Sequence, residues 1–317
     1  MKATRIHRFG PPEVIELEEI PRPEPGENEV LVRVEAAGVG PWDAWIRAGK
    51  SVLEQPLPLT LGSDLSGTVV AVGKGAEKVS PGAQVFGVTN PRFVGAYAQY
   101  AVARVGMLAP KPSRLNHEES ASVPVVAVTA LQMLFEHAQV QAGQRVLIHG
   151  AGGNVGAYAV QLALRAGAHV IGTGTAQGAL YAKSLGAQQV IDIEGADFTR
   201  LVAPVDVVID TVGGQVQTRS FSVLTSGGVL VSSVSQPNPE EAKASGVRAQ
   251  FILVDVTSAA LTRIAELLDA GELRTRLGPV LPLAEARHAH EMLEGLRPRI
   301  PGKIVLSVGD GTPTGLR

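Results

Sequence analysis

Short apolar segments alternate with segments of helical periodicity across the second half of this chain, and this alternation constrains the fold more than any other feature. The apolar segments predict six strands, at Arg145–His149, His169–Thr173, Gln189–Ile191, Val205–Asp210, Gly228–Ser233 and Gln250–Val254. The periodic segments predict helices at Glu118–His137, Val155–Arg165, Gly178–Leu185, Gln215–Leu224 and Ser258–Ala270. Parallel strands need long crossover connections, which are usually helices, so the alternation predicts an α/β fold with a doubly wound parallel sheet.

The N-terminal part of the chain has a different period. Val30, Val32 and Val34 alternate with more polar or outward positions, as in a strand with one buried face. Further short strands are predicted at Gly67–Gly73 and Ala98–Ala103, between turns rich in proline and glycine. This pattern predicts a β-barrel or a β-sandwich.

The C-terminal segment contains a predicted helix, Leu283–Leu293, and a predicted strand, Lys303–Val308. Gly271 and two prolines punctuate the chain before them, so we expect the segment to return to the N-terminal domain. The predicted domains are therefore residues 1–117 with 275–317, and residues 118–274.

The composition excludes several classes of chemistry. The chain of 317 residues has no cysteine, which excludes disulfides, thiolate nucleophiles, cysteine-bound zinc and iron–sulfur clusters. Its 28 basic and 30 acidic residues leave no positive surplus for binding nucleic acid. The sequence has no run of about 18 apolar residues and no apolar segment that resembles a signal peptide. We therefore expect a cytoplasmic protein that binds neither nucleic acid nor a membrane.

A glycine-rich loop follows the first strand of the alternating region. Arg145–His149 runs directly into Gly150-Ala151-Gly152-Gly153-Asn154-Val155-Gly156, and a helix begins there. Small residues let the backbone approach a pyrophosphate, and the helix N-terminus supplies free N–H groups, so the loop predicts a dinucleotide site. A tight turn without a ligand is the alternative. No Gly-Lys-Ser/Thr follows, which argues against an ATPase or a GTPase.

The residues that follow the second predicted strand, His169–Thr173, favour one of the two nicotinamide dinucleotides. An NAD site usually has an Asp or a Glu about 20 residues past the loop, on the ribose 2′-OH. This sequence has Thr173, Gly174 and Thr175 there, and no acid from His137 through Ile191. A carboxylate would repel a 2′-phosphate, so its absence favours NADP(H), with Lys183 as a candidate cation. A general scarcity of acids on a buried face would explain part of this gap.

Four motifs in order resemble one enzyme superfamily. They are Gly38-Val39-Gly40-Pro41-Trp42-Asp43-Ala44-Trp45-Ile46-Arg47-Ala48-Gly49, Gly62-Ser63-Asp64-Leu65-Ser66-Gly67-Thr68-Val69, Val123–Ala130 and Gly302-Lys303-Ile304-Val305. With them, the chain resembles the zinc-independent, quinone oxidoreductase-like branch of the medium-chain dehydrogenase/reductase superfamily. The resemblance implies a GroES-like β-barrel catalytic domain (1–117 and 275–317), a Rossmann NADP-binding domain (118–274), an active site in the cleft between them, and a homodimer.

Two departures from the family pattern concern the substrate pocket. Gly40 stands where the family has Asn, and Trp45 stands where it has Tyr. We therefore expect the substrate pocket to be more apolar than that of typical quinone reductases. The positions of the zinc ligands in other members match Gly40, Ser63 and roughly Val125, none of which can bind the metal. No metal site is therefore predicted.

The predicted site residues fall into two groups. The resemblance places the substrate beside Gly40, Trp42, Asp43, Trp45, Ser63 and Asp64. The predicted cofactor contacts are Thr129, Gly150, Ala151, Gly152, Gly153, Asn154, Val155, Gly156, Thr173, Gly174, Thr175, Lys183, Val212, Ser233, Phe251 and Lys303.

Several of these residues have structural interpretations as well. The two aspartates are expected to hold loops or to pair with a residue such as Arg47 rather than to act in catalysis. The two tryptophans could stack on a flat substrate or belong to the barrel core. No general acid can be named from the sequence.

These predictions together describe an NADPH-dependent, metal-independent reductase that transfers hydride to a quinone or an activated alkene (enone). The alternative is a catalytically weak NADPH-binding protein that serves as a redox sensor or has a structural role.

Overall fold

The computed structural model describes residues 1–309 and divides into two compact units. The first unit comprises Met1–Val125 and the chain from Val256 on, and the second comprises Val126–Asp255. The predicted domain boundaries are 117/118 and 274/275, whereas the boundaries between the two units lie at 125/126 and 255/256. The second boundary lies earlier than predicted because helix α9 (Ser258–Asp269) packs against strand β8 (Leu108–Pro110), which belongs to the first unit. Positions 310–317 of the predicted catalytic domain lie outside the described residues.

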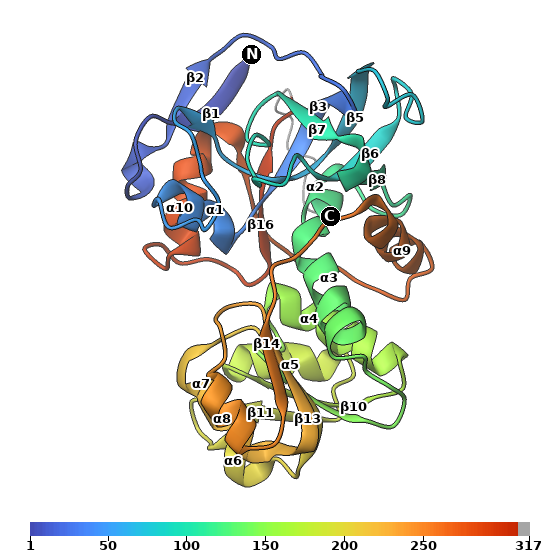
Figure 1. The fold of residues 1–317 in the computed structure, drawn as a ribbon. Coiled ribbons are helices and arrows are strands. Elements are labelled where there is room, and N and C mark those ends of the chain that lie inside the picture. The colour runs from blue at the N-terminus through green and yellow to red at the C-terminus, as the bar shows by residue number, and fades with distance from the viewer. Residues whose placement is uncertain (310–317) are drawn as a thin grey trace. The chain divides into compact units, whose positions relative to one another are not determined.

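The second unit is built on a six-stranded parallel sheet (Figure 1). The strand order is β11–β10–β9–β12–β13–β14, so successive crossovers lead outward in both directions from β9. The predicted doubly wound parallel sheet is thereby confirmed. The strands are β9 (Arg145–His149), β10 (His169–Gly174), β11 (Gln189–Asp192), β12 (Val205–Asp210), β13 (Leu224–Ser232) and β14 (Arg248–Phe251).

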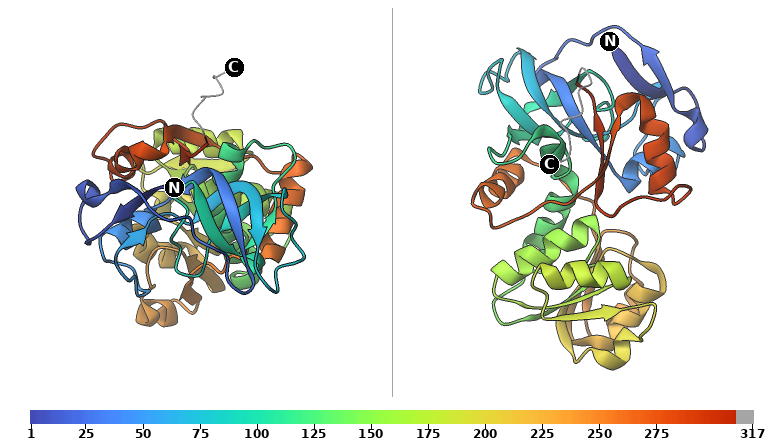
Figure 2. Two further views of the ribbon diagram at one scale, coloured as in Figure 1. Left: turned by 90° about the horizontal axis from the view of Figure 1, so that it is seen from above. Right: turned by 180° about the vertical axis from the view of Figure 1, so that it is seen from behind.

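Helices cover both faces of this sheet. Figures 1 and 2 show α4 and α5 on one face and α7 and α8 on the other. Because both faces are covered, the strands bury continuous apolar runs such as Val146-Leu147-Ile148. The helices are α3 (Pro124–Leu131), α4 (Asn154–Arg165), α5 (Ala176–Ser184), α6 (Phe198–Leu201), α7 (Gly214–Ser220) and α8 (Pro239–Ala244), with a π-helical turn η3 (Gln132–His137) and a 3₁₀ turn η4 (Phe221–Val223).

The structure differs from several of the predicted elements. The last strand of the sheet, β14, spans Arg248–Phe251 rather than Gln250–Val254, and the helix predicted at Gln215–Leu224 is divided into α7 and η4. The helix predicted at Glu118–His137 is divided into α2 (His117–Ala121), α3 and η3, because Pro124 disfavours helical backbone at the residue before it. The short helices α6 and α8 had no periodic signal long enough to be predicted. Strand β13 begins at Leu224 rather than at Gly228.

The first unit is mainly antiparallel β-structure. A seven-stranded sheet has the order β15–β16–β3–β5–β6–β8, with β7 also paired to β3, and a smaller sheet has the order β2–β1–β4. The strands are β1 (Lys2–Ile6), β2 (Glu16–Glu19), β3 (Glu29–Val39), β4 (Leu59–Thr60), β5 (Asp64–Val72), β6 (Gln84–Val88), β7 (Tyr100–Arg104), β8, β15 (Leu277–Pro282) and β16 (Lys303–Ser307). The helical segments are η1 (Pro12–Val14), α1 (Pro41–Arg47), η2 (Val105–Met107), α2, α9, η5 (Leu283–Glu285) and α10 (Ala286–Leu293).

The C-terminal segment returns to this unit, as predicted. Strand β16 pairs antiparallel with β3, with Ile304 opposite Val39. Val30, Val32 and Val34 of β3 are buried in the same apolar cluster as Ile304. Within residues 1–309, no helix is both long enough and apolar enough to cross a membrane.

Candidate functional site

The glycine loop makes a tight connection between β9 and α4. Gly150 has a φ of +69°, a left-handed conformation that favours glycine. A Cβ at Gly156 would lie 2.1 Å from the carbonyl oxygen of Gly150, so only glycine permits this approach of helix to strand end. The Ala151 N–H donates to the Thr173 carbonyl at 2.9 Å, which fixes the loop on the neighbouring strand.

The N-terminus of α4 presents backbone N–H groups. Gly153 is the N-cap, no side chain caps the helix, and the N–H of Ala157 donates to the Gly153 carbonyl at 2.9 Å. The preceding amides, from Asn154 to Gly156, come too early in the helix to have partners within it. Together with the helix dipole, they form a site suited to a phosphate group.

The parallel sheet gathers most of the predicted cofactor contacts at one edge. In register, Thr173 and Asp210 both lie beside His149, Ser232 lies beside Asp210, and Phe251 lies beside Ser232. Gly174 is the last residue of β10, and the strand ends are followed by the loop 150–156, Thr175, Val212 and Ser233. The sheet order reverses at β9, and ligands of doubly wound folds bind at such a point, outside the carboxyl ends of the strands.

The hydroxyl of Thr173 is engaged within the protein and is not available to a ligand at this edge. Its side chain is 1% exposed, and its Oγ1 lies 2.8 Å from His149 Nδ1. His149 Nε2 lies 2.8 Å from Ser220 Oγ, so both ring nitrogens have partners, and burial lowers the pKa of His149 to about 4. His149 therefore has a packing role, as its position at a strand end suggested, whereas Thr175 is exposed at the N-cap of α5.

The structure places an acid near the position where the sequence shows none. Asp192, at the end of β11, lies in register beside Gly174. The acid-free stretch of sequence ends one residue earlier, at Ile191, so only strand pairing brings this carboxylate to β10. Asp192 Oδ1 accepts from the N–H of Glu194 at 3.1 Å, within its own turn.

Asp210 organises the loop that follows β12. Its Oδ1 accepts from the N–H groups of Val212 (3.0 Å) and Gly213 (2.8 Å), and its Oδ2 accepts from Ser232 Oγ (2.8 Å) and Gln217 Nε2 (2.9 Å). These bonds fix the backbone beside Val212 and tie it to the end of β13. Gln217 is the residue that sequence reasoning missed, because its partners are fixed by folding and no local motif marks it.

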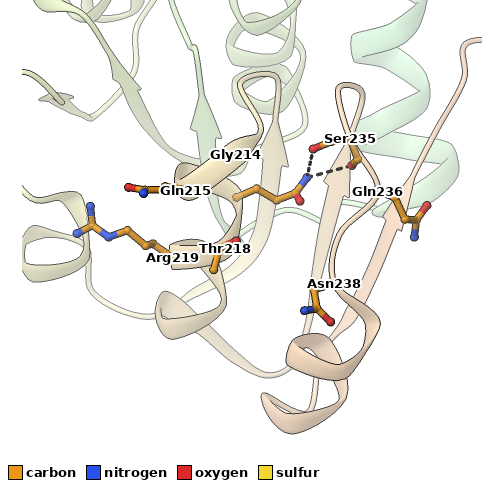
Figure 3. A pocket seen from close by; sticks show the side chains of 8 residues that line it. Gly214, Gln215, Thr218, Arg219, Ser235, Gln236 and Asn238 are labelled. Carbon is orange, nitrogen blue, oxygen red and sulfur yellow. Dashed lines mark hydrogen bonds between the residues drawn. The ribbon is translucent and has the colours of Figure 1, made fainter.

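A hollow of about 610 Å³ lies between α7 and the chain after β13 (Figure 3). Gln217 Nε2 also donates to the carbonyl oxygen and to Oγ of Ser235, and thereby joins α7 to the chain after β13. The lining is mostly uncharged and polar, with Gly214, Gln215, Gln217, Thr218, Arg219, Ser235, Gln236 and Asn238. The Arg219 guanidinium pairs with Asp197, so its charge is already compensated.

Two other predicted cofactor contacts of this unit lie on helices. Thr129 is 5% exposed on α3. Lys183 is exposed on α5, where its Nζ donates to the Gln188 carbonyl at 3.3 Å. This weak, exposed contact leaves the ammonium able to meet an anion.

In the first unit, the indole of Trp42 covers Gly40. A Cβ at Gly40 would lie 2.3 Å from the Trp42 ring, so no larger side chain fits there while the ring stays in place. The indole Nε1 donates to Ser63 Oγ at 3.0 Å. The Trp42 ring thus fills the space beside the two positions that carry zinc ligands in other family members. Trp45 is 48% exposed, which excludes it from the barrel core.

A buried ion pair lies behind this indole. Asp64 Oδ2 is 2.9 Å from Lys303 Nζ, and both side chains are at most 2% exposed. The ammonium also lies 4.2 Å from the centroid of the Trp42 ring. Asp64 Oδ1 accepts from the N–H of Val125 at 3.1 Å. Burial raises the pKa of Asp64, and the Lys303 charge opposes that rise.

Asp43 is a second buried acid close to Trp42 and Lys303. Its Oδ2 accepts from the N–H of Gly40 (2.8 Å) and from the hydroxyl of Tyr97 (3.1 Å). Burial raises the pKa of Asp43 to about 7, although these donors and Lys303 act in the opposite direction. Desolvation and the adjacent Asp43 raise the pKa of Tyr97 well above its usual value. Asp43 and Asp64 therefore both hold loops, in agreement with the structural interpretation.

The suggested pairing of these acids with Arg47 is wrong. Arg47 is 1% exposed, and it donates to the Gly10 carbonyl, contacts His290 Nδ1 at 3.0 Å and pairs with Glu294. Burial and this guanidinium lower the pKa of His290 to about 3. Two of these partners, His290 on α10 and Glu294 directly after it, come more than two hundred residues later in the chain, so no local pattern identifies them.

The positions that bind zinc in relatives do not fit the metal here. Gly40 and Val125 have no ligand atom, and Ser63 Oγ is occupied by the Trp42 indole. Among residues 1–309, one group of three possible metal ligands lies close together, His7, Glu16 and Glu18. The Glu18 carboxylate is already bound by Arg5 and His7.

Comparison with known proteins identifies both units. An alcohol dehydrogenase GroES-like domain matches residues 26–113, a zinc-binding dehydrogenase model matches residues 185–306, and a Glu/Leu/Phe/Val dehydrogenase model matches residues 115–206. The quinone oxidoreductase of Sus scrofa is 33% identical over 96% of this chain and 97% of its own length.

Solved structures agree with this assignment. The quinone oxidoreductase from Coxiella burnetii has a TM-score of 0.89 and 36% identity, over 97% of this chain and 99% of its own. An Escherichia coli quinone oxidoreductase, solved with NADPH, has a TM-score of 0.87 and 28% identity, over 97% of this chain and 100% of its own. With its GroES-like unit, its doubly wound sheet and these likenesses over nearly the whole length, the chain belongs to the quinone oxidoreductase-like branch of the medium-chain dehydrogenase/reductase superfamily and is an oxidoreductase.

Proposed function

We propose that this NAD(P)H-dependent oxidoreductase uses NADPH to reduce a quinone or an activated alkene (enone) without a metal. The observation that carries the proposal is the carboxyl edge of the parallel sheet. There, an uncapped helix N-terminus follows a glycine loop, and the turn after β10 has the exposed hydroxyl of Thr175 instead of a carboxylate. The relatives named quinone oxidoreductases, one of them solved with NADPH, support the same assignment.

The residues at this edge are suited to a dinucleotide. The N–H groups of Asn154, Val155 and Gly156 would hold the pyrophosphate. Thr175 and Lys183 would meet the 2′-phosphate by a hydrogen bond and by charge, respectively. Val212 and Ser233, fixed through Asp210 and the end of β13, would border the nicotinamide ring, which supplies hydride when it is bound.

On the substrate side, two indoles offer flat apolar surfaces. Trp42 is held by Ser63 and Lys303, and Trp45 is exposed. A quinone or an enone is already electrophilic, so its reduction needs no Lewis acid. The Trp42 N–H donates to Ser63 and the Tyr97 hydroxyl donates to Asp43, so these donors are engaged within the unit. We therefore assign the proton that completes the reduction to solvent.

Two assays test the proposal. Absorbance of the reduced cofactor is followed with a panel of quinones and enones, and the affinities for NADPH and NADH are compared by calorimetry. We expect turnover with at least one acceptor and tighter binding of NADPH. Tight binding of NADPH without turnover on any acceptor would support the redox-sensor alternative instead, and equal affinities would refute the preference for NADPH.

A pair of variants tests whether position 175 sets the preference for NADPH over NADH. Thr175→Asp introduces a carboxylate at the exposed position directly after β10, and we expect the affinity for NADPH to fall about tenfold or more while that for NADH is kept. Thr262→Asp makes the same charge change at an exposed position of the first unit, and it should leave both affinities unchanged. Equal effects of the two variants would show that net charge alone is responsible.

A further inference from the structure

A histidine and two glutamates converge on the N-terminal strands of the first unit. His7 directly follows β1, and Glu16 and Glu18 belong to β2. One ligand atom from each, an imidazole nitrogen or a carboxylate oxygen, lies within 4.8 Å of the other two. A tetrahedral zinc ion holds its nitrogen and oxygen ligands about 3.4 Å apart. His7 and Glu16 are exposed, so small rotations of their side chains suffice to close this difference.

The pairing of β1 with β2 fixes where the two glutamates lie (Figure 1). The strands are antiparallel, with Arg5 opposite Glu16 and Ala3 opposite Glu18. Successive side chains of a strand point to opposite faces, so Glu16 and Glu18 share one face of β2 and Arg5 lies on the same face of β1. The backbone therefore holds both carboxylates on one face without help from an ion.

The arginine on this face does not neutralise Glu16. Arg5 stands opposite Glu16, yet its Nη1 lies 3.4 Å from Glu18 Oε2 and its Nη2 donates to the Pro58 carbonyl at 3.2 Å. The Glu16 carboxylate has no hydrogen-bond or ion-pair partner among residues 1–309. Two carboxylates that approach each other repel, and the exposed Glu16 is free to turn away into solvent. Its position beside Glu18 and His7 therefore favours a divalent cation between them.

Glu18 has one oxygen that an ion can use. Its Oε2 is the atom that pairs with Arg5, whereas its Oε1 contacts His7 Nε2. Carboxylates that bind metals are commonly held by an outer partner on the other oxygen, which fixes their orientation. An ion between Oε1 and Nε2 would replace the direct contact of Glu18 with His7, and any proton on that nitrogen would pass to solvent.

We propose that His7, Glu16 and Glu18 bind a zinc ion, with water as the fourth ligand. Zinc accepts an imidazole nitrogen together with carboxylates, whereas calcium and magnesium take oxygen ligands. The two carboxylates also balance the charge of the ion. The ion links the end of β1 to β2 and closes the segment between them, which contains η1. This site is structural and independent of the proposed reductase activity, because none of its residues belongs to the predicted cofactor or substrate contacts.

The test titrates zinc chloride into the full-length protein, free of any affinity tag, by isothermal titration calorimetry. We expect one ion per chain and a midpoint of thermal unfolding that rises with zinc, because a ligand that binds only the folded chain stabilises it. His7→Gln and Glu16→Gln should each weaken binding about tenfold or more. Absence of saturable binding up to about 1 mM zinc would refute the proposal. Neither NADPH nor a substrate is present, so the result does not depend on the proposed reductase function.

His288 provides the matched control. It is exposed and lies 3.5 Å from a single glutamate, Glu285, but it belongs to no group of three possible ligands among residues 1–309. His288→Gln should therefore leave both the affinity for zinc and the rise in unfolding temperature unchanged. Circular dichroism without zinc should show that all three variants are folded, since each changes an exposed side chain. Affinity that is kept in His7→Gln or Glu16→Gln, or lowered equally by His288→Gln, would overturn the assignment.

Discussion

Replacing Gly40 with alanine would place a methyl group against the ring of Trp42. The new Cβ would lie 2.3 Å from Cη2 of that ring, far inside van der Waals contact. Gly40 has extended backbone angles, a φ of −128° and a ψ of 163°, which alanine adopts without strain. The main penalty of Gly40→Ala therefore arises from the contact with Trp42.

The ring can escape only by giving up its own contacts. Rotation would break the 3.0 Å bond from Nε1 to Ser63, worth about 1 kcal/mol, and would lose the contact with the Lys303 ammonium, worth about 0.5–2 kcal/mol. Retaining the ring would cost about 1–3 kcal/mol of overpacking. By either route, we expect Gly40→Ala to lower the free energy of unfolding by about 2 kcal/mol.

A double-mutant cycle isolates this contact. In a Trp42→Ala background the steric conflict is absent, so Gly40→Ala should be nearly neutral. There, the small loss of a good N-cap residue and the gain from a stiffer unfolded chain nearly cancel. Urea unfolding followed by circular dichroism gives the four stabilities. Fluorescence of Trp45 reports on the same unit, since Trp42 and Trp45 are the two tryptophans of the chain. If Gly40→Ala costs the same in both backgrounds, the indole is not what keeps position 40 small.

Three further substitutions test the buried charges. Asp43, with a pKa raised from 3.8 to about 7, keeps its proton in the folded chain after the unfolded chain has lost it. Its stabilising contribution is therefore full below about pH 4 and is lost as the pH rises through about 7. Asp43→Asn does not titrate, so between about pH 5 and 8 the wild type should lose about 2 kcal/mol relative to it, and a pH-independent difference in urea unfolding would contradict the assigned shift. Lys303→Met leaves Asp64 buried without its cation and should cost about 3–5 kcal/mol, whereas adding Asp64→Asn should restore most of this loss; a double variant as unstable as Lys303→Met would show that the ion pair is not responsible.

The parallel sheet and its phosphate loop were predictable because their signals are local. A run such as Arg145–His149 followed by glycines and an amphipathic helix defines strand, turn and helix without reference to the rest of the chain. The parallel pairing of the strands then sets their carboxyl ends at one edge. For that reason, residues as distant in sequence as Gly150, Val212 and Ser233 could be assigned to one site from the sequence pattern.

Side-chain partners required the tertiary structure. Thr173 reads as a ribose contact in sequence, yet its hydroxyl faces His149, which lies 24 residues earlier in the chain. Asp192 lies just outside the acid-free stretch, and only the register of β10 with β11 brings it beside Gly174. Two partners of Arg47, His290 on α10 and Glu294 directly after it, likewise come from the C-terminal segment, which packs beside α1.

The sequence alone therefore determined the six strands of the parallel sheet, the order in which they follow one another in the chain, and where a dinucleotide phosphate could be held. These properties depend on hydrophobic periodicity and on backbone conformation over a few neighbouring residues. Tertiary structure decided which polar groups remain available for a ligand. A buried donor or acceptor must find a partner wherever folding places one, so Trp42 is held by Ser63 and Lys303, whereas the exposed carboxylate of Glu16 is left without a partner among the described residues.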